Sequence, residues 1–327
     1  MRLKMKDMFT GELGPGLHDI SAEEYHADPC PVPSLSSTLA RLMLNRSPRH
    51  AWTQHPRLNP DYESKDSKAF DIGRAAHRAV LGKGGDFVAY PDHVLAKNGA
   101  ASTTAAKEWA EEMRARGMTP VKAEEADAAN DMAAEIMGRL AFMDMAFPPA
   151  RSELTVIAEI DGVMCRAMID HAPEDPRQPL WDLKTTTDAS PQAVMRAIMA
   201  YGYDIQAAHY TEVWKAATGE ERAFQFVFVE KEAPHECCVV RLGGDSMVMA
   251  SKRTRRAREM WRHCLTTGQW PGYPAEIVQL ELPEFYQARW LERETFEAEV
   301  KQSTGRDVLE SAYLWQAPEH QGTNPWA

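Results

Sequence analysis

The middle of the chain carries apolar and polar residues in patterns that are typical of β-strands. Two runs, residues 154–160 and 163–170, are rich in apolar residues and are joined by Asp161-Gly162. An Asp-Gly pair between two such runs favours a tight hairpin turn, so we expect these two strands to pair. Turn residues bound three further strand-type runs, which cover residues 180–186, 224–229 and 236–242.

Segments with apolar residues at helical spacing lie on both sides of these strands. Ser34, Ser36 or Ser37 can cap the first of them, a proline suits the start of the second, and Gly82 ends the third. Helices interspersed with strands in this order predict a mixed α/β fold. The expected helices cover residues 34–45, a short stretch from Pro48, 70–81, 102–116, 121–146, 190–200, 203–217 and 245–267.

The composition of the 327 residues excludes several classes of protein. With 44% hydrophobic residues and a mean hydropathy of −0.48, the chain can form a core, and no apolar run approaches the ~20 residues that cross a bilayer. We therefore expect a cytoplasmic protein without a membrane partner. The five cysteines show no Cys-x-x-Cys spacing, which argues against a disulfide framework, a zinc ribbon or an iron–sulfur cluster.

We expect an N-terminal helical arm at 1–62, a core at 63–270 and a C-terminal extension at 271–327.

The chain is acidic overall, but one segment of it is rich in basic residues. A net charge of −11, from 37 basic and 48 acidic residues, speaks against a nucleic-acid partner if it is taken alone. The expected helix 245–267 nevertheless has six basic residues between Ala250 and Arg262 against the single acid Glu259, and Arg258 belongs to the arc opposite the apolar stripe. Such a concentration of arginine suits phosphate contacts, although a solvated charged face is the alternative. The candidates for phosphate contact are Arg41, Arg46, Arg74, Lys252, Arg255, Arg256 and Arg262.

The strand at 180–186 carries the most informative polar residues. Alternate side chains of a strand share a face, so Asp182 and Lys184 point the same way while their apolar neighbours point into the opposite layer. If the preceding strand pairs with this one, Asp170 at its end joins them. Two carboxylates beside a lysine can hold a hard divalent cation.

Two helices add further candidates, and each has an ordinary alternative. His77 lies on the apolar face of the helix 70–81, where a histidine is more often a core residue than a ligand. Gly73, one turn earlier on that face, lets a ligand come close, which favours a ligand role for His77 somewhat. Gln206 and Tyr210 are four residues apart and share a helix face, which a simple packing stripe would also give.

The ordered set of these residues resembles the PD-(D/E)XK nucleases, and among them the RecB-like branch with the RecE (exonuclease VIII) group of phage exonucleases. The resemblance covers residues 30–270 and is clearest at 165–170 (CRAMID), 182–186 (DLKTT) and 202–210 (GYDIQAAHY). It implies a restriction-endonuclease-like core, with a central mixed β-sheet flanked by helices. The proline of the family name is absent, since Ile169 precedes the first acid, but proline supplies no chemistry.

The resemblance also implies a role for each candidate. Lys184 would orient or deprotonate the attacking water, and Gln206 and Tyr210 would position the nucleophile or the DNA strand. Either Glu153 or Glu159 can be a further acid near the site, and the sequence does not choose between them. The ligands that it implies for Mg²⁺, or alternatively Mn²⁺, are His77, Asp170, Asp182 and the carbonyl of Leu183.

For the reaction, the resemblance implies metal-dependent hydrolysis of DNA phosphodiester bonds, running 5′ to 3′ from double-stranded ends. It also implies a ring-shaped homo-oligomer, a tetramer or trimer, that hands single strands to an annealing protein, and the basic residues named above would contact the DNA. An endonuclease or nickase with the same site is one alternative. A catalytically idle module that binds DNA ends is another, but such a module has no use for Lys184 on the face of Asp182.

Overall fold

The structure is a computed structural model, and it describes residues 12–63, 71–82, 86–145 and 150–310, with the backbone alone at 71–74 and 150. The chain divides into two compact units, Met1–Gly272 and Tyr273–Ala327. The first unit contains the central sheet and its flanking helices. The arm expected at 1–62 and the core expected at 63–270 therefore lie within one unit.

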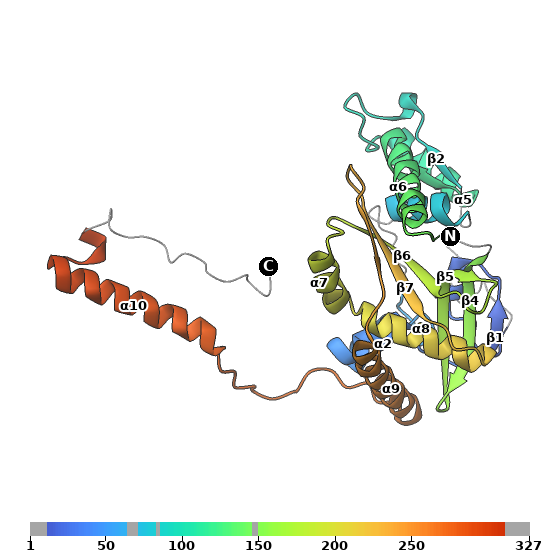
Figure 1. Cartoon of the computed structure of the whole chain (residues 1–327). Helices are drawn as coiled ribbons and strands as arrows, with labels where there is room; N and C mark the ends of the chain where they lie inside the picture. Colours follow the sequence, from blue (N-terminus) through green and yellow to red (C-terminus); the bar gives the residue numbers. More distant parts are fainter. Residues whose placement is uncertain (1–11, 64–70, 83–85, 146–149, 311–327) are drawn as a thin grey trace. The chain divides into compact units, whose positions relative to one another are not determined.

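A mixed sheet forms the centre of the first unit (Figure 1), and six strands of the described residues build it. Their order is β1-β4-β5-β6-β7-β8, and all neighbours are antiparallel except the parallel pair β6 and β7. This confirms the expected mixed α/β fold with a central sheet flanked by helices. The strands are β1 (Gly16–His18), β4 (Ala150–Ile160), β5 (Val163–Pro173), β6 (Leu180–Thr186), β7 (Phe224–Glu230) and β8 (Cys237–Val240).

The hairpin between β4 and β5 forms where the sequence predicts it. The register pairs Ile160 with Val163, and Asp161 and Gly162 between them have φ angles of 54° and 73°. These angles lie in the left-handed region that a two-residue hairpin turn needs, which Asp and Gly tolerate better than other residues. β5 therefore runs back along β4 and ends beside β6.

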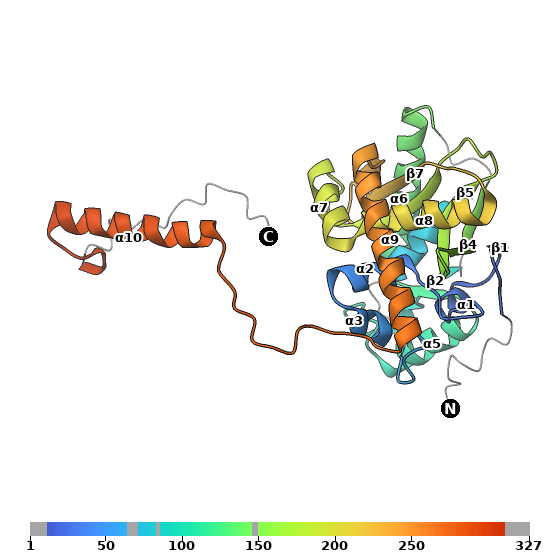
Figure 2. The same ribbon diagram turned by 90° about the horizontal axis from the view of Figure 1, so that it is seen from below.

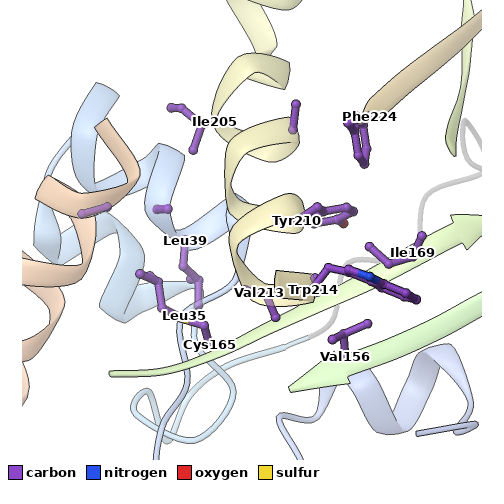
Figure 3. Close-up of a cluster of buried hydrophobic side chains, with 14 of the residues drawn as sticks. Leu35, Leu39, Val156, Cys165, Ile169, Ile205, Tyr210, Val213, Trp214 and Phe224 are labelled. Atoms are coloured by element: carbon purple, nitrogen blue, oxygen red, sulfur yellow. The ribbon is translucent and has the colours of Figure 1, made fainter. Parts of the chain in front are cut away.

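The larger core lies between one face of the sheet and a group of helices that includes α2 (Ser37–Asn45), α3 (Pro48–Thr53), α8 (Tyr203–Thr218) and α9 (Gly244–Thr267). Helices α2, α8 and α9 lie close together in both views of the ribbon (Figures 1 and 2). In Figure 3, Trp214 of α8 lies beside Val156 and Ile169 of the sheet. Burial of large apolar side chains from segments far apart in the chain holds this half of the fold together.

A second core lies on the other face, where Trp181 and Leu183 pack with α4 (Asp71–Leu81) and α6 (Ala123–Phe142). A pair of parallel strands, β2 (Phe87–Ala89) and β3 (Thr119–Val121), follows α4 and precedes α6 in the chain. The sequence does not predict this pair, because three residues are too few for an alternating pattern and Pro120 argues against a strand. The remaining helices described in this unit are α1 (Ala22–His26), α5 (Thr104–Ala115), α7 (Pro191–Tyr201) and the 3-10 turn η3 (Asp92–Val94).

The first helix of the expected set, residues 34–45, begins later than predicted. Its cap is Ser36, whose hydroxyl accepts the N–H of Leu39 at 3.4 Å. Leu35 is extended instead, because its N–H donates to the carbonyl of Met164 and its carbonyl accepts the N–H of Arg166. A backbone bridge to β5 therefore competes with the first helical turn, and it ties the N-terminal arm to the sheet.

The second unit contains α10 (Glu284–Thr304), and none of the residues of this helix is buried. Val308 is the buried apolar residue of the unit's described part. Among the helices of the described ranges, none has the length and apolar character that spanning a membrane requires.

Candidate active site

Asp182 and Lys184 share one face of β6, as the alternation of a strand requires. Trp181 and Leu183 belong to the core on the α6 side, so the two polar side chains lie on the opposite face, toward α8. The Lys184 ammonium forms an ion pair with Oδ2 of Asp182. Asp182 is 2% exposed, so removing the lysine would leave a buried carboxylate charge without compensation.

Asp170 comes to the same place from β5. The register pairs His171 with Trp181, which puts Asp170 and Asp182 opposite each other one position further along. Oδ2 of Asp170 accepts the backbone N–H of Leu183 at 2.8 Å. This hydrogen bond fixes the carboxylate against the backbone that separates Asp182 from the lysine.

His77 approaches the two strands from α4, whose residues Ala75, Ala76 and Val80 are buried in the second core. Its Nε2 lies 3.0 Å from the carbonyl oxygen of Leu183, and its Nδ1 lies 3.8 Å from Oδ2 of Asp170. The first distance is a hydrogen bond, while the second exceeds hydrogen-bond length. The ring is 26% exposed, so this histidine lies at the edge of the core and not inside it.

The charges of the site change the ionisation of its members. Burial raises the pKa of Asp182 to about 6, and the Asp170 carboxylate adds to the rise, whereas Lys184 and His77 oppose it. Burial opposes the charged form of Lys184, but the carboxylates of Asp182 and Asp170 outweigh it and raise the pKa of the lysine. Without a bound ion, the lysine is therefore the resident cation of the site.

Gln206 and Tyr210 lie on the same face of α8, as their spacing predicts, but in different surroundings. The Gln206 amide donates to Oδ1 of Asp182 at 2.6 Å. Tyr210 is 7% exposed and packs edge-on against Phe224, with ring centroids 5.8 Å apart. Burial raises the pKa of Tyr210 well above its ordinary value of 10.0. Gln206 thus contacts the site directly, and Tyr210 lies in the core behind it.

Tyr203 is a further member of the site that sequence reasoning missed. The Lys184 ammonium lies 5.1 Å from the centroid of its ring, within the range of a cation–π interaction. Its position three residues before Gln206 puts it on the same helix face, which is the signal that could have identified it. The preceding Gly202 has a φ of 66°, and a Cβ there would lie 2.8 Å and 2.9 Å from Cδ and Cγ of Arg41. Arg41 is therefore close to the site.

The donor chemistry of the site fits a hard divalent cation. Asp170, Asp182 and the carbonyl of Leu183 supply oxygen, and His77 supplies one nitrogen, a set that suits Mg²⁺ or Mn²⁺. Oδ2 of Asp182 is buried without a well-formed hydrogen bond, and its contact is the ion pair with Lys184. Within the described part of the chain, no three His, Cys, Asp or Glu side chains form a ready-made metal cage.

The register of β4 distinguishes the two glutamates that the sequence left open. Glu153 lies between the pairs Ser152–His171 and Leu154–Ile169, and so opposite Asp170, with a φ of 48°. Glu159 pairs with Met164, six residues further along the strand, which corresponds to ~20 Å. Glu153, and not Glu159, is therefore the glutamate whose backbone lies beside Asp170.

The basic residues chosen for phosphate contact are spread over the first unit. Arg46 is exposed and its Nη2 lies 3.2 Å from Nε2 of His50, and the side chain of Arg74 lies outside the described residues. On α9, Lys252 and Arg255 are exposed, and Arg256 pairs with Glu259 at 2.9 Å.

Two further arginines of α9 bind acidic or carbonyl groups of the first unit. The expectation that Arg258 lies on the exposed arc is wrong, because it is 5% exposed and pairs with Glu212 and Asp161. Arg262 donates to the carbonyl of Asp161 at 2.8 Å, at the hairpin end of the sheet. Asp161 and Asp170 are nine residues apart on the hairpin strand, a span of ~30 Å, so Arg262 lies far from the two carboxylates.

Comparisons with known structures support the fold. The structure of a candidate exonuclease from Eubacterium rectale is 14% identical, covers 81% of this chain and 97% of its own, and superposes with a TM-score of 0.54. A phage-related exonuclease from Haemophilus somnus (13% identical, 60% and 95% covered) gives 0.29. An alkaline exonuclease from Laribacter hongkongensis (12% identical, 62% and 100% covered) gives 0.24. Scores as low as these last two carry no conclusion.

Comparison at the level of sequence families is more decisive. No curated protein matches the chain. A family model described as "PDDEXK-like domain of unknown function (DUF3799)" matches residues 36–281. The matched region includes the two strands with Asp170, Asp182 and Lys184 and the helix with Gln206. The chain therefore belongs to the PDDEXK-like family DUF3799, within the PD-(D/E)XK superfamily that the sequence motifs predicted.

Proposed function

We propose that this chain is a metal-dependent deoxyribonuclease that degrades double-stranded DNA from its ends in the 5′-to-3′ direction. The observation that carries the proposal is the meeting of Asp170, Asp182 and Lys184 where β5 and β6 lie side by side. Buried charges are costly as purely structural elements, so their concentration where these two strands meet favours a chemical role. The likeness in fold to a candidate exonuclease from Eubacterium rectale agrees with this activity.

The carboxylates of Asp170 and Asp182 and the carbonyl of Leu183 would hold one Mg²⁺ or Mn²⁺ ion, with His77 as a nitrogen donor. Lewis-acid activation of the scissile phosphate and of a water is the chemistry that such an ion supplies when bound. Gln206 holds Oδ1 of Asp182 through its amide, so this carboxylate keeps its orientation whether or not the ion is present.

Lys184 has the position to orient the attacking water and to stabilise negative charge on the phosphate. Its side chain is 20% exposed, so the ammonium can meet solvent or substrate from this face. A fixed positive charge where negative charge develops lowers the barrier without reorganisation of solvent. Exchange of the proton between water and lysine becomes easier once a second cation lies nearby, because like charges disfavour the ammonium.

The finer assignments rest on the resemblance to the RecE group. A preference for duplex ends, a ring of three or four copies and transfer of the remaining strand to an annealing protein would follow from it. In such a ring, the exposed Lys252 and Arg255 would face DNA while the acidic residues face outward. A cytoplasmic location, where bacterial and phage DNA is accessible, fits the same proposal.

Two other functions use the same residues. An endonuclease or nickase would need the same ion and lysine but no free end. A DNA-end-binding module without catalysis would need basic residues but not a buried Asp182–Lys184 pair, so the pair argues against it. The endonuclease is therefore the stronger alternative.

The proposal can be tested by incubating the purified full chain with Mg²⁺ and either linear or covalently closed circular DNA. We expect rapid loss of the linear duplex, release of nucleotides from 5′-labelled ends, and survival of the circle. Lys184→Ala should lose activity by at least about a hundredfold, as expected for a group that acts on the reacting atoms. Rapid cutting of the circle would favour the endonuclease.

Lys215→Ala is the matched control, because Lys215 is an exposed lysine paired with Glu221 away from the site. It should keep wild-type activity. Equal inactivity of the wild type and Lys184→Ala with every divalent ion would overturn the nuclease and leave the binding module.

A further inference from the structure

The geometry points to Tyr203 as a positioning residue that receives the Lys184 ammonium when a divalent cation takes its place at Asp182. This inference rests on the proposed function and adds a residue that neither the family motif nor the ligand set contains. The observation behind it is that Lys184 contacts two partners at once, the carboxylate of Asp182 and the face of the Tyr203 ring.

The first step concerns the oxygens of Asp182. Oδ1 accepts the Gln206 amide at 2.6 Å, and Oδ2 contacts the Lys184 ammonium. An ammonium and a divalent ion on one carboxylate oxygen repel each other at a few ångströms in a buried site, where charges are poorly screened. Ion binding at Asp182 therefore requires the ammonium of Lys184 to give up Oδ2.

The second step concerns the place to which the ammonium moves. β7 pairs Phe226 with Asp182 and Phe228 with Lys184, so two phenyl rings line this face of the sheet. The Tyr203 ring packs against both, with centroids 5.8 Å and 5.9 Å away. These contacts hold the electron-rich face of the Tyr203 ring beside the lysine. Once a divalent ion occupies the Asp182 carboxylate, this ring face can still stabilise the Lys184 ammonium.

The third step concerns what fixes Tyr203 itself. It is the first residue of α8, directly after Gly202, which ends α7 and precedes α8 in the left-handed conformation. Arg41 occupies the space that a side chain at 202 would need. The ring is half-buried and also meets Tyr201 at 5.7 Å. Contacts with three aromatic rings thus keep the Tyr203 ring beside Lys184 before any ion arrives.

The exchange predicts a specific pattern of ion affinities that does not depend on catalysis. Titration of the full chain with Mn²⁺, with free Mn²⁺ followed by electron paramagnetic resonance, measures it directly. Tyr203→Leu should weaken Mn²⁺ binding about three- to tenfold, because the ammonium depends on the ring more strongly once Asp182 no longer balances its charge. Tyr203→Phe keeps the ring and should stay within about twofold of the wild type, while Lys184→Met should bind Mn²⁺ more tightly.

A double-mutant cycle separates this role from ordinary packing. In the Lys184→Met background there is no ammonium to receive, so Tyr203→Leu should leave the Mn²⁺ affinity unchanged. The same loss in both backgrounds would mean that Tyr203 merely shapes the site, and the inference would be overturned. If Tyr203→Leu does not fold, trifluorinated phenylalanine at 203 replaces it, since this ring keeps its shape but loses its negative face, and it should weaken Mn²⁺ binding relative to Phe.

Failure of the inference can be told apart from failure of the proposed function. A wild type that binds Mn²⁺ and degrades DNA, but shows no coupling between residues 203 and 184, retains the function and loses only this role of Tyr203. A wild type that binds no Mn²⁺ at all overturns both.

Discussion

Asp182 is the residue whose chemistry its surroundings change most. Its carboxylate is 2% exposed, holds the Gln206 amide on one oxygen and contacts the Lys184 ammonium with the other. Burial raises the pKa of Asp182 to about 6, and Asp170 contributes to the shift. A carboxyl group with such a pKa makes the stability of the ion-free protein depend on pH in a direction opposite to that of most acids.

The first prediction is this pH dependence. Because the pKa of Asp182 in the folded state exceeds the ordinary value of 3.8, the folded protein holds the proton more tightly than the unfolded chain. The stabilisation is complete below pH 4 and is lost as the pH rises through about 6, by on the order of 3 kcal/mol. Urea unfolding in EDTA should show the free energy of unfolding of the wild type, relative to Asp182→Asn, falling between pH 4 and 7.

Asp188→Asn provides the control for that measurement. Hydrogen bonds with Ser190 lower the pKa of Asp188, so its contribution is present above the ordinary value and is lost as the pH falls. The two variants should therefore give slopes of opposite sign. Parallel curves for wild type and Asp182→Asn would contradict the raised pKa.

The second prediction concerns Glu153, which lies opposite Asp170 in the register. A carboxylate beside a ligand supports the charge and orientation of an ion site, and its loss typically costs about ten- to a hundredfold. We expect Glu153→Gln to lower Mn²⁺-dependent DNA cleavage about tenfold or more. Glu159→Gln, ~20 Å further along β4, should stay near the wild type. A larger loss of cleavage for Glu159→Gln than for Glu153→Gln would show that the strand register does not determine which glutamate supports the site.

Single residues differ in how far the sequence predicts them. The common face of Asp182 and Lys184 follows from the two-residue period of a strand, which needs no tertiary information. The selection of Glu153 over Glu159 does not, since it depends on a register that only pairing with β5 sets. Tyr203 was missed because periodicity groups residues by face without saying which of them meets the lysine.

Among the elements, those with a strong local signal were predictable. The β4–β5 hairpin follows from Asp161-Gly162 between two apolar runs, and α3 begins at Pro48 as expected. The short strands β2 and β3 were not predicted, because three residues are too few to show the two-residue period of a strand. The late start of α2 escaped because its cause is a backbone bridge between Leu35 and a strand 130 residues away.

The third prediction concerns the junction of α7 and α8 at Gly202. An alanine there would adopt a φ of 66° with strain and would place its Cβ within 2.9 Å of Arg41. We expect Gly202→Ala to reduce the free energy of unfolding by about 1–2 kcal/mol, as measured by urea unfolding. Gly138→Ala is the matched control, since this glycine lies inside α6 with nothing within 4 Å of the added Cβ. It should stabilise the protein by about 0.5–1 kcal/mol.

The fourth prediction concerns the basic face of α9. Lys252 and Arg255 lie in the same turn of α9 as Arg253, which pairs with Asp204 in the first turn of α8. Arg262 is bound to Asp161 at the far end of the sheet. In binding assays with duplex ends and Ca²⁺ in place of Mg²⁺, Lys252→Ala and Arg255→Ala should weaken binding about three- to tenfold and reduce its salt dependence. Arg262→Ala should change it less than twofold, and equal losses for all three would contradict this arrangement.

For the whole molecule, the acidic total is compatible with a nucleic-acid substrate because the charge is unevenly distributed along the chain. Residues 273–327 carry ten acidic and four basic residues, so more than half of the net charge of −11 belongs to the second unit. The first unit, which contains the candidate site, carries the remaining net charge of −5, spread over residues 1–272. Net charge is therefore a poor guide to the partner of this protein, and local charge decides.

The whole fold also explains why the site needs so many segments. α4 brings His77, β5 brings Asp170, β6 brings Asp182 and Lys184, and α8 brings Gln206. The sequence predicts the elements and the family motif, but only the two cores on opposite faces of the sheet determine that these side chains meet.

The most direct test is a crystal structure of the full chain grown with Mn²⁺, with anomalous diffraction recorded at the manganese edge. The account predicts one strong anomalous peak at ~2.1 Å from the carboxylate oxygens of Asp170 and Asp182 and the carbonyl of Leu183. Lys184 should be displaced from Oδ2 of Asp182 in the same crystal. An anomalous peak elsewhere, or none in crystals whose protein degrades DNA with Mn²⁺, would contradict it.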